Sequence, residues 1–138
     1  MNINIDSVIN EIKNEEVGYC GRNLLLETYY ELVDNEKTFD DINFIALDDI
    51  EISVEDFINL AKDIVYNYGY GLAEISEELV IVGNDWWLER EEYDGSEWWE
   101  FRTKPEKPEG KAVLSGNGFR DENGNIHCIK SSSPFIPI

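Results

Sequence analysis

The stretch WWLEREEYDGSEWWEFR, residues 86–102, decides the fold of this chain. Two aromatic-rich runs flank Asp94-Gly95, a dipeptide that favours a two-residue β-turn because both residues tolerate a positive φ angle. A turn at this place pairs Tyr93 with Ser96 and thereby fixes the register. The register sets Glu91 opposite Trp98, Arg90 opposite Trp99, Glu89 opposite Glu100 and Leu88 opposite Phe101. The sequence therefore predicts an antiparallel β-hairpin over residues 86–102.

Alternation along this hairpin separates its side chains into two faces. We expect one face to join the core, and it carries Trp86, Leu88, Arg90, Trp99 and Phe101. The other face carries Trp87, Glu89, Glu91, Trp98, Glu100 and Arg102. Three interpretations of this second face are open: its two indoles cover the back of the sheet beneath another segment, stack on a carbohydrate, or, ringed by carboxylates, bind a basic protein surface. A different loop length would exchange the two faces.

The first half of the chain is typical of helices, because apolar residues recur at helical spacing. The first expected helix has Ile5, Val8, Ile9 and Ile12 on one face. Asp6 or Ser7 is placed to cap its start, and Gly18 to end it. A second helix is expected from Arg22 to Val33 and a third from Val54 to Tyr68. The third would begin at a cap formed by Ser53 with Asp56 and end at Gly69 and Gly71.

Strand patterns follow in the second half. Short β-type runs cover Leu72 to Ser76 and Leu79 to Val82, and Asn123-Gly124 predicts a second hairpin. Pro105 and Pro108 make an extended connector. The sequence therefore predicts an α+β fold, in which N-terminal helices pack on a C-terminal antiparallel β-meander with a Trp-rich hairpin. We expect a single domain over 1–138, with helices in residues 1–70, an antiparallel sheet in residues 71–130 and a tail over residues 131–138.

The chain is strongly acidic, with 30 Asp and Glu against 11 Lys and Arg and a net charge of −19 on 138 residues. Residues 1–60 sum to −12, residues 61–100 to −9 and residues 101–138 to +2. Such a charge repels phosphate backbones and anionic lipids, which disfavours direct binding to nucleic acids or membranes. The 17 Phe, Trp and Tyr residues favour a folded protein over a solvated acidic tail.

The hydropathy pattern, the N-terminal sequence and the cysteines together indicate the compartment of the protein. No apolar run reaches the roughly 18 to 20 residues that span a bilayer, and the N-terminus lacks the pattern of a signal peptide. Cys20 and Cys128 are typical of reduced thiols, although a bridge between them is possible. The expected location is the cytoplasm, which is that of the host cell if a phage encodes the protein.

Residues that could carry chemistry are few. His127 beside Cys128 lacks the spacing of a zinc site, and Cys20 could act as a nucleophile only if His127 folded onto it. The glycines match no phosphate-binding loop, and the acidic segments match no EF-hand loop. We therefore expect no catalytic residues, no metal and no cofactor.

The block NDWWLEREEYDGSEWWEFRTKPEKP, residues 84–108, covers about a fifth of the chain. It resembles a segment of small acidic accessory proteins of phages and prophages of low-GC Gram-positive bacteria. The opening MNINIDSVINEIKNEE is similar to that of small acidic anti-CRISPR inhibitors. The resemblance implies inhibition by occupying the nucleic-acid site of a host enzyme, and it implies no catalytic residue.

Three hypotheses of function follow. The first is a non-enzymatic acidic inhibitor of a basic, nucleic-acid-binding host or defence protein, with nucleic-acid mimicry as one form. The second is an immunity or assembly protein that binds one cognate partner through the Trp hairpin, and the third is a small hydrolase. Acidity that serves only solubility is the alternative to all three. The candidate partner-binding residues form two groups: Trp87, Glu89, Glu91, Trp98 and Glu100 on the hairpin, and Asp48, Asp49, Glu51, Glu55 and Asp56 in a second acidic cluster.

Overall fold

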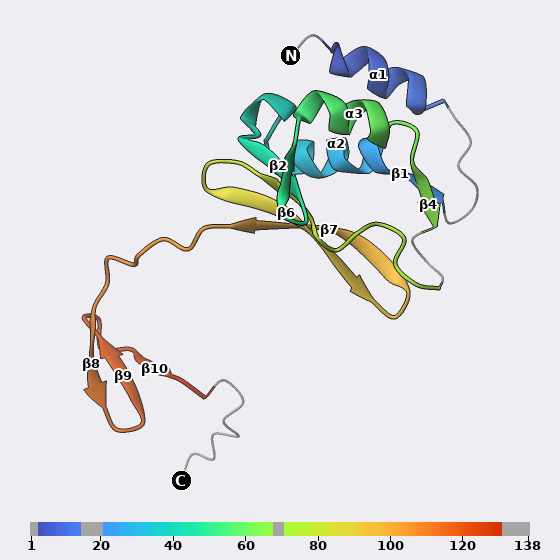
Figure 1. Ribbon diagram of the computed structural model, residues 1–138. Helices are drawn as coiled ribbons and strands as arrows, with labels where there is room; N and C mark the ends of the chain where they lie inside the picture. The colour runs from blue at the N-terminus through green and yellow to red at the C-terminus, as the bar shows by residue number, and fades with distance from the viewer. Residues whose placement is uncertain (1–2, 15–20, 68–70, 131–138) are drawn as a thin grey trace. The chain divides into compact units, whose positions relative to one another are not determined.

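The computed structural model describes residues 3–14, 21–67 and 71–130. The chain forms two compact units, residues 1–104 and residues 105–138. Figure 1 shows both units along the chain. The sequence predicts one domain over 1–138, and that grouping stays a prediction.

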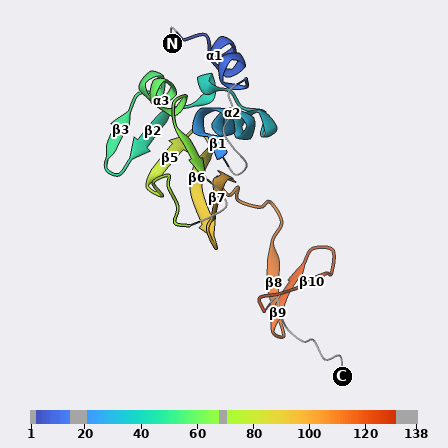
Figure 2. The same cartoon turned by 90° about the vertical axis from the view of Figure 1, so that its right-hand side faces the viewer.

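The first unit is built on a five-stranded antiparallel sheet. Its strands, in spatial order, are β3 (Ile50–Ile52), β2 (Phe44–Leu47), β5 (Leu79–Val82), β6 (Trp86–Tyr93) and β7 (Ser96–Thr103). Three helices, α1 (Ile5–Ile12), α2 (Leu24–Asp34) and α3 (Val54–Ala61), lie on one side of this sheet (Figure 2). A separate two-stranded ladder pairs β1 (Gly21–Asn23) with β4 (Val65–Asn67). The predicted α+β class is therefore confirmed.

The Trp-rich hairpin has the predicted register, and its second strand runs one residue beyond the predicted end, to Thr103. Tyr93 pairs with Ser96, Glu91 with Trp98 and Arg90 with Trp99. Asp94 and Gly95 both have positive φ angles, 50° and 86°, as a type I′ turn requires. Trp86 and Trp99 are 5% and 3% exposed, whereas Trp87 and Trp98 are half-buried. The predicted assignment of the two faces is confirmed.

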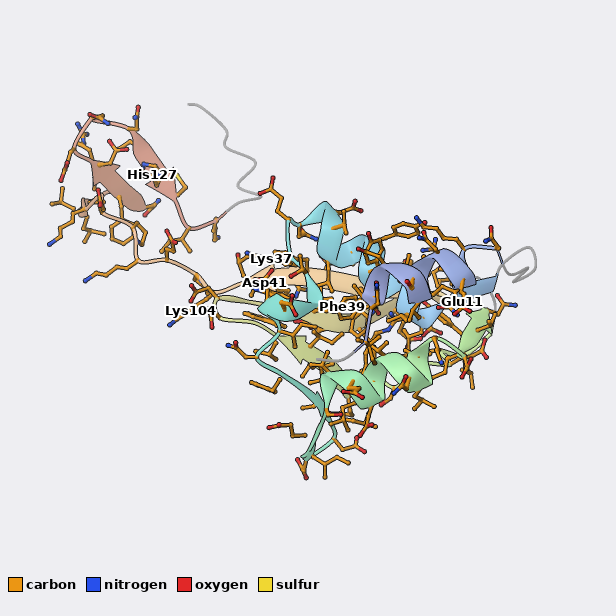
Figure 3. The ribbon with its side chains drawn as sticks, turned by 90° about the horizontal axis from the view of Figure 1, so that it is seen from above. Glu11, Lys37, Phe39, Asp41, Lys104 and His127 are labelled. Atoms are coloured by element: carbon orange, nitrogen blue, oxygen red, sulfur yellow. The ribbon has the colours of Figure 1, made fainter. Side chains whose placement is uncertain are left out.

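Helix α2 is the central helix of the core. Asn23 caps its start by accepting a hydrogen bond from the Leu26 amide at 3.0 Å. Leu24, Leu25 and Leu32 are at most 2% exposed, and they pack with Ile45, Ile58, Ile81 and Leu88 between the helices and the sheet. A short 3-10 helix, η1 (Phe39–Asp41), adds the buried ring of Phe39, which is labelled in Figure 3.

Several predicted helix boundaries are wrong. Helix α2 begins at Leu24 and not at Arg22, because Gly21–Asn23 forms β1, and α1 ends at Ile12 rather than at Gly18. The start of α1 is capped by Asn4, which accepts from the Ser7 amide, rather than by Asp6 or Ser7. The third helix ends at Ala61 and not at Tyr68, because Ile64, Val65 and Tyr66 favour extended backbone and Val65–Asn67 pairs with β1. Gly18 and Gly69 lie outside the described residues.

Strands also occupy stretches of the predicted helical half. β1, β2, β3 and β4 all lie before residue 70, and β2 with β3 extends the main sheet. Conversely, Leu72 to Ser76 does not form the predicted strand. The backbone amides of Glu74 and Ile75 instead donate to the side-chain carboxylate of Glu97, at 2.6 and 3.1 Å. The Glu97 side chain therefore accepts the backbone hydrogen bonds that a neighbouring strand would otherwise accept.

The second unit is a small antiparallel sheet in the order β10 (Ile126–Cys128), β9 (Gly118–Asp121), β8 (Ala112–Ser115). The hairpin predicted at Asn123-Gly124 is present, with Gly124 at a φ of 87°. Among its described residues, 105–130, only Gly118 is buried. No helix in the described ranges is long and apolar enough to cross a membrane.

Candidate functional site

The face of the main sheet that points away from the helices gathers aromatic and acidic side chains. We call it the outer face and define it by cross-strand rows. One row runs Phe44, Val82, Trp87, Arg102; the next runs Glu51, Ala46, Val80, Glu89, Glu100; and the third pairs Glu91 with Trp98. Phe44 is 40% exposed, and the two valines and two tryptophans are half-buried. Figures 1 and 2 place the described helices on the opposite side of this sheet.

Each outer indole is bound to a carboxylate two residues further along its own strand. The Trp87 Nε1–H donates to Glu89 Oε1 at 2.7 Å, and the Trp98 Nε1–H donates to Glu100 Oε2 at 3.0 Å. Both pairs result from strand alternation, which puts residues i and i+2 on the same face. The indole hydrogen bond, more than the charge of Arg102, holds the pKa of the Glu89 carboxyl below its usual value. The two rings are thereby fixed in orientation along the sheet.

An arginine of the chain, Arg102, already pairs with two of the acidic residues of this face. Arg102 Nε lies 3.0 Å from Glu89 Oε1, and its Nη2 lies 3.2 Å from Glu91 Oε1. The Arg102 side chain is 46% exposed, so a partner can reach it. Glu89 and Glu91, predicted as contacts for a basic partner, therefore hold an arginine of their own chain. A guanidinium from a partner would have to share these two carboxylates with Arg102 or displace Arg102 from them.

The second predicted cluster divides among the outer face, the helix side and the turn between β2 and β3. Glu51 stands opposite Ala46 and joins the outer face. Glu55 and Asp56 lie in the first turn of α3, on the helix side, where the helix dipole favours their negative charge. Asp48, with a φ of 54°, and Asp49 form the turn between β2 and β3. All five residues are exposed, but they belong to three different places in the fold.

Behind the outer face lies a buried ionic cluster around Arg90, whose side chain is 2% exposed. Its Nη2 lies 3.1 Å from Glu97 Oε1 and donates to the Tyr66 hydroxyl at 3.2 Å, while its Nη1 lies 3.6 Å from Glu27 Oε1. The Tyr66 hydroxyl also bonds Glu27. The guanidinium stacks 4.8 Å from the Trp99 ring centroid. Within the described residues the Nε and Nη1 atoms have no hydrogen-bond partner, although Nη1 lies beside the Glu27 carboxylate.

This cluster fastens the hairpin to α2 and to the segment before β5. The Trp99 Nε1–H donates to Thr28 Oγ1 at 2.9 Å. Burial raises the pKa of the Glu27 carboxyl, and the nearby Arg90 charge only partly opposes that effect. Alternation along the hairpin places Arg90 on the core face, and a core-facing arginine signals a buried acidic partner. Glu27 and Tyr66 could not be identified as its partners, because they lie far away in sequence.

No family model, curated protein or solved structure matches this chain.

Two of the residues weighed for chemistry from the sequence, His127 and Cys128, lie in the second unit. His127 (Figure 3) is exposed, and its Nε2 lies 2.8 Å from Asp121 Oδ2. That hydrogen bond, with amide donors from Asn125 and Asn123, lowers the pKa of the Asp121 carboxyl to about 2. Cys128 is an exposed free thiol, and Cys20 lies outside the described residues. Across 3–14, 21–67 and 71–130, no group of three His, Cys, Asp or Glu side chains is arranged to hold a metal ion.

Proposed function

We propose that this chain is a non-enzymatic acidic binding protein that attaches through its outer face to a basic surface of another protein. The observation that carries the proposal is a pair of indoles, each hydrogen-bonded to a glutamate, on a sheet face away from the helices. A half-exposed tryptophan in a carboxylate frame offers both an apolar contact and a partner for Lys or Arg. Because the rings are already fixed, binding would cost little side-chain entropy.

The distribution of charge supports a basic partner. Residues 1–104 contain 26 acidic and 7 basic side chains and therefore carry the whole charge of −19, whereas residues 105–138 contain four of each. A field of that size accelerates encounter with a positively charged surface and discourages acidic partners. Proteins that bind nucleic acids present such surfaces. We therefore propose a nucleic-acid-binding host or defence protein as the target and inhibition as the result.

Nucleic-acid mimicry is the more specific form of this proposal. It requires carboxylates that are available to the Lys and Arg groups which normally meet phosphates. Glu89 and Glu91 are bridged by Arg102, so Glu51 and Glu100 are the outer-face acids that support mimicry best. If a phage or prophage encodes the chain, the site of action is the host cytoplasm.

The test is capture of partners from a lysate of a low-GC Gram-positive bacterium, with immobilised full-length chain. We expect a basic protein to be retained at about 50 mM salt and released near 500 mM, because salt screens exposed charges. Trp98→Ala should lose that protein. Tyr93→Ala, which removes a 76% exposed ring at the hairpin tip, is the matched control. An identical set of captured proteins for all three chains would contradict the proposal.

The paired indoles also favour a second candidate, an immunity or assembly protein with one cognate partner. Such a complex would depend on Trp87 and Trp98 and hardly on salt, because buried aromatic contacts are not screened. Retention of a single protein at about 500 mM salt, lost with Trp98→Ala, would favour this candidate over the inhibitor.

A further inference from the structure

A groove of about 350 Å³ lies on the helix side of the sheet, away from the outer face. It runs between α3, the β2–β3 hairpin and residues 74–76, and its apolar lining includes Leu47, Ile52, Phe57, Leu60, Ile64 and Ile75. Leu60 is 66% exposed at the edge of the groove, although it belongs to a helix that also carries the buried Phe57, Ile58 and Ala61. The volume falls within the roughly 300–1,000 Å³ typical of ligand pockets.

Acidic residues surround this groove. Asp56 and Glu74 line it directly. Residues 74–76 also form one wall of a neighbouring hollow of about 550 Å³, whose lining includes Arg90 and the acidic residues Glu77, Glu78, Glu91, Glu92 and Glu97. The groove and the hollow thus meet along a shared wall of three residues.

That wall is held in place by the buried cluster. Glu97 accepts hydrogen bonds from the amides of Glu74 and Ile75 and lies 3.1 Å from Arg90 Nη2. The Glu74 carboxylate in turn accepts from the Asn67 amide at 2.7 Å. Arg90 lies beside Glu97, and Arg102 lies beside Glu91. The remaining negative charge of the hollow belongs to Glu74, Glu77, Glu78 and Glu92, which are exposed. The site is therefore organised before anything binds.

We infer that the groove and the hollow together form a second docking site, for a partner segment that presents aliphatic side chains beside Lys or Arg. The aliphatic groups would enter the groove, and the cations would reach across the wall to Glu77, Glu78 and Glu92. The acidic surroundings disfavour fatty acids and other anionic amphiphiles, which an apolar groove alone would accept. The inference does not depend on the proposed role of the outer face, because the two surfaces share only Glu91, whose carboxylate is paired with Arg102.

A direct test uses two synthetic 14-residue peptides as probes. One alternates Leu and Lys at helical spacing, and the other has the same lysines with every Leu replaced by Ser. Each is titrated into the isotope-labelled full-length chain and followed by NMR. We expect the Leu/Lys peptide to shift the backbone amides of Leu60, Ile64 and Ile75 and to bind about tenfold more tightly than the Ser/Lys peptide, as burial of leucine side chains would give.

Two variants test the groove and the hollow separately. Leu60→Ser should weaken the Leu/Lys peptide about fivefold and leave the Ser/Lys peptide unchanged, because the truncated side chain is largely exposed and unimportant for folding. The double variant Glu77→Lys, Glu78→Lys should weaken both peptides. The matched controls are Leu114→Ser, at a side chain that is 76% exposed in the second unit, and the double variant Glu106→Lys, Glu109→Lys.

Three results would overturn the inference: equal affinities for the two peptides, no effect of Leu60→Ser, or no binding of either peptide. Shifts confined to the indole N–H signals of Trp87 and Trp98 would also overturn it, since they would assign binding to the outer face. None of these results would contradict the proposed function, which is tested by the Trp98→Ala capture.

Discussion

Trp99 shows how one residue can couple the hairpin to the helices. It is 3% exposed, donates to Thr28 and carries the Arg90 guanidinium on its ring. Trp99→Ala should therefore lower the free energy of unfolding by about 3–5 kcal/mol, from lost burial and the cavity left behind. Urea denaturation measures this value. Trp98→Ala, at the half-buried neighbour, is the control and should cost clearly less; equal losses would contradict the assignment of faces.

The lowered pKa of Asp121 predicts how the second unit responds to acid. Its pKa is about 2 in the folded chain, below the ordinary 3.8, mainly because His127 bonds the carboxylate. A lowered pKa contributes stability that is present above the unfolded value and is lost as pH falls through the folded value. The β9–β10 hairpin should therefore weaken between about pH 4 and pH 2. Carbon NMR titration of the Asp121 carboxyl should give a midpoint near 2, and His127→Ala should move it toward 3.8; an unchanged midpoint would exclude the His127 bond.

At the scale of elements, helix α1 tests which residue caps a helix. Asn4 accepts from the Ser7 amide at 3.2 Å, whereas the sequence pattern favours Asp6 or Ser7 itself. Asn4→Ala should destabilise the chain by about 1 kcal/mol, as loss of an N-cap usually does. Thermal unfolding followed by circular dichroism provides the measurement. Ser7→Ala is the matched control, and a larger effect at Ser7 than at Asn4 would assign the cap to Ser7.

The elements also show what could be predicted from sequence. The Trp hairpin and its register are predictable because Asp94-Gly95 and strand alternation are local signals. The end of α3 is not, because apolar residues at helical spacing continue through Val65, and the pairing of Val65–Asn67 with the distant β1 is not a local signal. Strands β2 and β3 could not be predicted, because apolar and polar residues do not alternate regularly over residues 44–52. Likewise, the indole–glutamate pairs of the outer face follow from alternation, whereas the Glu27–Tyr66–Arg90 contacts depend on the folded chain.

For the whole molecule, burial predicts that the two units differ in stability. Every buried apolar side chain of the described residues lies within 1–104. A fragment of residues 1–104 should therefore melt cooperatively at nearly the temperature of the full chain, whereas residues 105–138 alone should show no cooperative transition. Calorimetry of both fragments would test this. A cooperative melt of 105–138 would show that the small sheet is stable by itself.

Strand β7 stands at one end of the main sheet and is eight residues long. An edge strand of that length is a template on which a second molecule can add its own strand, which is the first step of aggregation. Mutual repulsion between copies opposes this step as long as the carboxylates are ionised. The chain has an isoelectric point near 4.1, where that repulsion disappears. Acidification to about this pH should therefore produce β-rich precipitates, so the excess of acidic residues would keep separate copies of the chain from aggregating at neutral pH.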